Sequence, residues 1–120
     1  MRFRDDTPPT PRGFSVALIF ALAAHQLHAF YEHGQWPSEA AMANLAVDWL
    51  NRQKTVLPLA ERRRLAGLGD TLARQIADGL SREAGLYAAH EMMEALDPNY
   101  QSEFAQSLMK ECERLFDAAA

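Results

Sequence analysis

Residues 14–33 read FSVALIFALAAHQLHAFYEH, and this stretch decides the fold. At the 100° rotation per residue of an α-helix, most of its large apolar side chains gather on one side. Phe14 and Leu18 fall elsewhere, so the first two turns are apolar nearly all round. Gly34 follows as a suitable left-handed cap. Because such a helix is normally central to a bundle or covered by a partner, we expect it at the centre of the domain.

Four further segments carry helical signals. Pro37-Ser38-Glu39 predicts the start of a helix that runs to about residue 53. Pro58 opens a segment that the Gly-Leu-Gly triplet at 67–69 interrupts, and Asp70 can cap its continuation. A fourth helix is expected over residues 82–96, and Asp97-Pro98 predicts the start of a fifth.

No alternating β-branched run and no Asn-Gly or Asp-Gly turn indicates a hairpin. The sequence thus predicts an all-α fold, a compact bundle of about five helices, four long and one short or broken at Gly67–Gly69. Residues 1–12, which hold three prolines among charges, are expected to be a flexible tail, and residues 13–120 a single helical-bundle domain.

The lone cysteine, Cys112, cannot form an internal disulfide. It falls on the apolar side of the last predicted helix, with Leu108, Leu115 and Phe116. Free cysteine is among the most buried residue types, so we expect a structural thiol. The acidic neighbours Glu111 and Glu113 argue against a reactive one.

The apolar run at residues 14–24 follows Arg12 and resembles the core of a secretory signal peptide. Asp5 and Asp6 spoil the basic leader, and the apolar periodicity continues past the supposed cleavage site at residue 23. The run is also shorter than the ~20 residues that span a bilayer. We expect a cytoplasmic protein with no membrane association, or a secreted one if residues 1–23 are a signal peptide.

The net charge of −4 is unevenly spread. Residues 58–82 carry five arginines against three acids, whereas residues 83–120 carry eight acids against two basic side chains. Arg62, Arg63 and Arg64 are the candidate contacts for nucleic acid, within a helix–turn–helix outline that ordinary helical hairpins share. The three side chains splay over about 200° of a helix and cannot all contact one strand of phosphates. Because the chain is also acidic, a DNA-binding hairpin is only the second alternative function.

Histidines and glutamates form two polar helix faces. His25, His28 and Glu32 share one face, and His90 and Glu94 share another, because residues three and four apart lie together. Packed against each other, the faces could bind a divalent transition metal such as zinc, iron or manganese. The Glu-x-x-His motif of bundle metal sites is missing, however, and patterning places both faces toward solvent. We therefore expect no cofactor, with this metal site as the first alternative.

No catalytic motif is present. The Gly-x-Ser-x-Gly nucleophile elbow is missing, and no strand precedes the glycines at 67–69 as a dinucleotide site requires. We therefore expect no enzymatic activity.

Helical patterning leaves several large side chains without an assigned place in the core. Aromatic residues anchor protein interfaces disproportionately, although Trp36 could equally close the core locally. The candidate interface residues are Phe14, Leu18, Tyr31, Trp36 and Tyr100. The sequence predicts a small soluble regulator, adaptor, inhibitor or immunity-type protein that acts by protein–protein interaction with another protein or a second copy of itself. Its acidic C-terminal half would steer it toward a basic partner.

Overall fold

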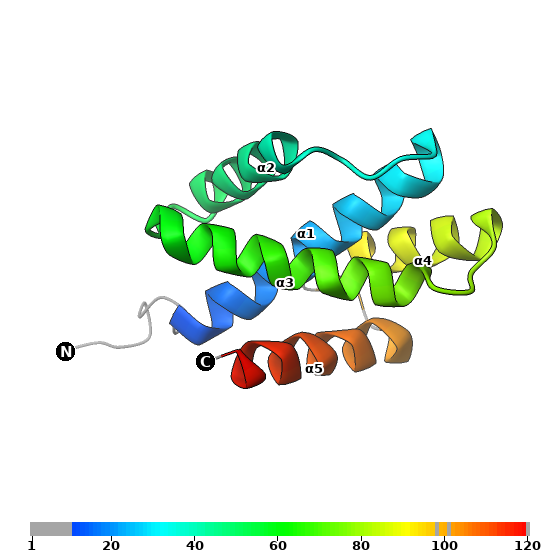
Figure 1. The fold of residues 1–120 in the computed structure, drawn as a ribbon. Coiled ribbons are helices and arrows are strands. Elements are labelled where there is room, and N and C mark those ends of the chain that lie inside the picture. The colour runs from blue at the N-terminus through cyan, green and yellow to red at the C-terminus, as the bar shows by residue number, and fades with distance from the viewer. Residues whose placement is uncertain (1–10, 98, 101, 120) are drawn as a thin grey trace.

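Five α-helices and their connections make up the described residues of this computed structural model, which are 11–97, 99–100 and 102–119 (Figure 1). No strand occurs among these residues. The predicted all-α bundle of five helices is therefore confirmed. The helices are α1 Pro11–His33, α2 Glu39–Arg52, α3 Leu59–Ala77, α4 Arg82–Glu94 and α5 Glu103–Ala118.

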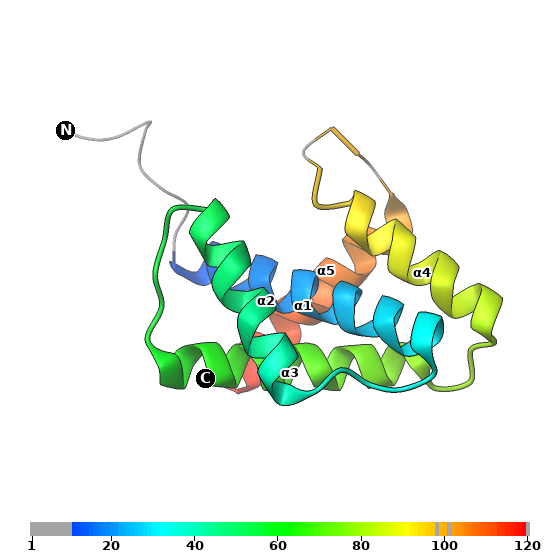
Figure 2. The same cartoon turned by 90° about the horizontal axis from the view of Figure 1, so that it is seen from above.

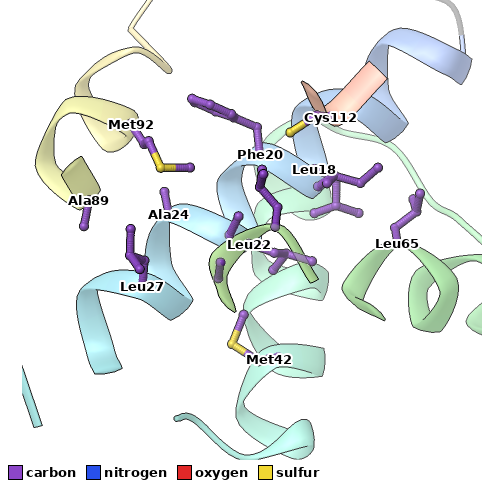
Figure 3. Close-up of a cluster of buried hydrophobic side chains, with 14 of the residues drawn as sticks. Leu18, Phe20, Leu22, Ala24, Leu27, Met42, Leu65, Ala89, Met92 and Cys112 are labelled. Atoms are coloured by element: carbon purple, nitrogen blue, oxygen red, sulfur yellow. The ribbon is translucent and has the colours of Figure 1, made fainter. Parts of the chain in front are cut away.

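The helix α1 lies in the middle of the other helices and packs against all four of them (Figures 1 and 2). Leu18, Ile19 and Phe20 project from α1 in different directions, yet all three are fully buried. Figure 3 shows the side chains that surround this helix, including Met42 of α2 and Met92 of α4. The expectation of a central first helix is met because its apolar surface has cover on every side.

The length and composition of α1 would also allow it to cross a membrane. The segment Gly13–His33 has 21 residues and a mean hydropathy of 1.5. It is therefore longer than the apolar run at residues 14–24 that the sequence analysis compared with a membrane span. In this structure 61% of its most apolar window is buried by protein. Such burial by protein is typical of the core helix of a globular domain. The absence of membrane association that the sequence predicted remains a prediction.

The start of α1 differs from the sequence prediction, whereas its end agrees with it. It begins at Pro11, so residues 11 and 12 belong to the helix and not to the predicted tail, whose other residues lie outside the described part of the chain. Gly34 adopts the left-handed conformation with a φ of 78°, and its N–H donates to the carbonyl oxygen of Phe30 at 2.8 Å. The predicted cap therefore forms.

The helix α3 continues without a break through Gly67 and Gly69, so the predicted interruption is wrong, and Asp70 lies inside the helix. A Cβ atom on Gly69 would lie 3.2 Å from the carbonyl oxygen of Ile19 and 3.2 Å from Cβ of Leu22. A Cβ atom on Gly67 would have nothing within 4 Å. Gly69 thus allows α1 and α3 to approach closely, a role that its spacing in the sequence does not distinguish from a helix break.

The predicted start of the last helix is also wrong. Asp97 accepts a hydrogen bond from the N–H of Asn99 at 2.9 Å and so shapes a turn, while Pro98 lies outside the described residues. The helix α5 begins at Glu103, where the hydroxyl of Ser102 accepts from the N–H of Ala105 at 3.3 Å. Serine and aspartate are both good caps, and the sequence alone does not choose between them.

Alanine substitutions of the two α3 glycines are expected to differ. Gly67→Ala should raise the free energy of unfolding by up to about 1 kcal/mol, because alanine favours a helix interior and the new methyl group meets open space. Gly69→Ala should lower it, because the methyl group meets the backbone of α1. Urea unfolding followed by circular dichroism measures both values, and equal effects would contradict the close-approach role of Gly69.

Cys112 is fully buried, as expected for a structural thiol. Burial, together with the charges of Glu111 and Glu113, raises the pKa of this thiol to about 12. The thiolate, which is the reactive form, is therefore scarce in the folded protein.

We expect the native protein to resist alkylation by iodoacetamide at mildly alkaline pH and to react promptly once it is unfolded in guanidinium. Mass spectrometry of samples quenched over time measures both rates. Fast modification of the folded protein would show that the thiol is accessible and ionised.

Candidate functional site

A groove of about 660 Å³ lies between α2 and α3. One wall comes from α2 and is apolar apart from Glu39 at its start, because Met42, Ala43, Ala46 and Val47 share a helix face at spacings of three and four residues. Ser38 fixes the start of this helix, since its hydroxyl accepts a hydrogen bond from the N–H of Ala41 at 3.1 Å. The volume falls within the range of natural ligand-binding sites.

The opposite wall is the face of α3 from Leu59 to Arg74, which spans about 22 Å at 1.5 Å per residue. Spacings of three and four residues place Arg62, Arg63, Gly67 and the other lining residues on this one face. The wall is thus both basic and open. The same spacing is visible in the sequence, but only the position of α2 shows that this face borders a groove.

Gln26 of α1 contributes to the groove lining from below and was not singled out in the sequence. It is only 3% exposed, and its Nε2 donates a hydrogen bond to Oδ1 of Asp70. Its Oε1 atom is buried and finds no donor among the residues that the structure describes. An unpaired buried acceptor costs about 1–3 kcal/mol, and this oxygen lies below the groove surface, out of reach of a group in the groove. The available signal was a glutamine within an otherwise apolar helix.

The end of the groove near Arg74 is closed by a stack of planar groups. Arg74 pairs with Asp70 through its Nε at 2.9 Å and lies 4.5 Å from the ring centroid of Trp36. That ring stacks on Phe30 with the centroids 4.1 Å apart and the planes 9° apart. Trp36 is half-buried and packs on Phe30 and Arg74 within the fold, and its interface role remains a prediction.

The predicted arginine cluster is divided between two environments. Arg62 and Arg63 line the groove, and neither forms an ion pair within the described residues. Arg64 instead binds Glu61 through two hydrogen bonds of 2.7 and 3.1 Å and lies 4.9 Å from the ring centroid of Phe116. The hydrogen bonds from Arg64 lower the pKa of Glu61. The three arginines therefore do not form one basic surface.

The other candidate interface residues are held by contacts within the fold. Leu18 is fully buried and Tyr31 is 9% exposed, so both are core residues and not surface anchors. The hydroxyl of Tyr31 shares its single proton between the carbonyl oxygens of Ala77 at 3.1 Å and Leu80 at 3.2 Å. Phe14 is half-buried.

Tyr100 belongs to a hydrogen-bonded cluster that joins α4 to the start of α5. Its hydroxyl donates to Oε1 of Glu91 at 2.6 Å, and the hydroxyl of Ser102 donates to Oε2 at 2.7 Å. These two bonds lower the pKa of Glu91, and the carboxylate raises the pKa of Tyr100 to about 12. The cluster positions the cap of α5, which is a structural role.

Two of the five predicted metal ligands meet. The rings of His28 on α1 and His90 on α4 lie edge to face, with centroids 5.1 Å apart and planes at 76°. His25 is half-buried, and its pKa is lowered by burial and by the charges of Arg52 and His28. Within the described part of the chain, no three His, Cys, Asp or Glu side chains are grouped closely enough to hold an ion together. Glu32 and Glu94 are exposed.

Tyr31→Phe tests the structural role of that residue. The variant keeps the buried ring and loses the hydroxyl that donates to α3 and to the α3–α4 connection. We expect the free energy of unfolding to fall by about 1 kcal/mol, which is the usual net value of one hydrogen bond. Thermal unfolding measures the change, and an unchanged stability would show that these hydrogen bonds are not formed in solution.

No protein-family model, no curated protein and no solved structure matches this chain. The function must therefore be argued from the groove and the neighbouring side chains themselves.

Proposed function

We propose that this protein acts by protein–protein interaction and that the groove between α2 and α3 binds an acidic amphipathic helix of its partner. The observation that carries this proposal is the contrast between the two walls. The wall from α2 is apolar apart from Glu39 at its start, and the other wall presents Arg62 and Arg63, neither of which forms an ion pair within the described residues. A segment with apolar side chains on one face and carboxylates beside them complements both walls.

The shape of the groove favours a helix as the bound segment. Its length of about 22 Å matches four turns of α-helix. Small residues, including Ala43, Ala66 and Gly67, line it and would let a helix backbone approach closely. Helices that lay an apolar face into a groove are a common mode of peptide recognition. Leu59, which is 51% exposed at one end, and Val56, 83% exposed just before it, extend the apolar contact.

Electrostatics then select among amphipathic helices. Arginine binds carboxylates with two parallel hydrogen bonds, so Arg62 and Arg63 would discriminate by geometry as well as by charge. The groove thus favours an acidic partner, whereas the overall charge suggested a basic one. Nucleic acid is a poorer match, because the apolar side chains of Met42 and Val47 cannot form hydrogen bonds or ion pairs with phosphates.

A pair of designed peptides tests this assignment. Both are amphipathic helices with the same leucine and alanine face, and one has glutamates where the other has lysines. Fluorescence anisotropy of labelled peptide should show saturable binding of the acidic peptide and at least tenfold weaker binding of the basic one. Arg62→Glu with Arg63→Glu should reverse this preference. Lys110→Glu on α5, an exposed position, is the matched control and should change neither affinity.

A steric variant separates the groove from general charge effects. Ala43→Trp fills the groove and should abolish binding of the acidic peptide, whereas Ala60→Trp, exposed on α3 outside the groove lining, should not. Equal loss in both variants, or no binding by the wild type, would overturn the proposal. Binding of duplex DNA that weakens steeply with salt would favour the nucleic-acid alternative instead. A dimer by light scattering that Ala43→Trp dissociates would identify the occupant as a second copy.

A further inference from the structure

His28 and His90 are in contact on the side of α1 that packs against α4. The two residues are far apart in the chain but their ring centroids are 5.1 Å apart, with the planes at 76°. An ion-bound imidazole nitrogen lies about 2.0–2.1 Å from zinc, so two rings on one tetrahedral ion have centroids about 5 Å apart. This centroid spacing is compatible with one ion shared by both rings, and rotation of the two side chains would direct one nitrogen of each ring toward it.

The packing of α4 on α1 holds the two rings in place. Small residues on α4, among them Gly85, Ala88 and Ala89, are buried against α1 and bring the helices close together. Figure 3 shows Ala24 and Leu27 of α1 beside Ala89 and Met92 of α4. A Cβ atom on Gly85 would overlap the ring of Tyr31, which sets the closest approach of the two helices. The histidines thus project from a rigid interface and not from mobile loops.

We infer that His28 and His90 form a binding site for a divalent metal ion of the nickel, copper and zinc group, with water in the remaining coordination positions. His90 is exposed and His28 is half-buried, so an ion reaches the rings without unfolding the bundle. Imidazole suits these three metals. A bound ion would link α1 to α4, and the inference does not depend on the groove.

Calorimetric titration of the untagged protein with Zn²⁺ is the direct test. The wild type should bind one ion per chain, and His28→Ala and His90→Ala should each lower the affinity at least tenfold. His33→Ala is the matched control, since His33 is an exposed histidine at the end of α1, and its affinity should stay unchanged. Circular dichroism confirms that each variant remains folded.

A spectroscopic readout reports the ligands themselves. The electron paramagnetic resonance spectrum of bound Cu²⁺ should show splitting from two nitrogen ligands in the wild type and from fewer in His90→Ala. Added Zn²⁺ should also raise the unfolding temperature of the wild type and of His33→Ala, but not that of His90→Ala, because binding to the native state stabilises it. Absence of binding, or equal loss in all three histidine variants, would overturn the inference.

Discussion

The complete burial of residues 18–24 in the middle of α1 is the constraint on which the other helices depend. Side chains as differently directed as Leu18, Ile19 and Phe20 are all fully buried, so no side of this helix can be left uncovered. The neighbouring helices cover α1 by packing closely against it. Gly69 brings the backbone of α3 against α1, and Gly85 accommodates the ring of Tyr31 beneath α4. Loosening any one of these helices would expose apolar surface on α1, whose burial is the main favourable contribution to folding.

The groove is a consequence of the same arrangement. Because α1 supplies most of the large core side chains, α2 and α3 face each other above it with small ones, such as Ala43, Ala66 and Gly67. Small residues fill little space, so part of the space between α2 and α3 remains open although the two helices also contact each other. Gln26 then lies beneath that space, where its carbonyl oxygen is buried without a donor in the described part of the chain.

The sequence patterns predicted where the helices occur more accurately than they predicted which residues contact one another between helices. Periodicity predicted the five helices, and the cap at Gly34 forms as expected, whereas the helix expected to start around Pro37 begins at Glu39 with Ser38 as its cap. A glycine in a helix, however, has the same local signature whether the helix breaks or another backbone approaches, so Gly69 needed the structure. Arg64 shows the same limit, since Glu61 three residues earlier indicated a local pair but not the ring of Phe116. The candidate interface set contained core residues because a helix apolar all round does not reveal which neighbours cover it.

The histidines show why a shared helix face is not yet a site. His25 and His28 are three residues apart, but the ring of His28 contacts His90 on α4, whereas the charge of Arg52 at the end of α2 helps to lower the pKa of His25. A three-residue step turns a helix by about 300° and leaves the two side chains 60° apart, enough to direct them toward different neighbours. Gln26 and His28 are separated by about 200° by the same rule, so they lie on opposite sides of α1. A partner in the groove and an ion at the histidines would therefore not compete for space, and any coupling between them must pass through α1 itself.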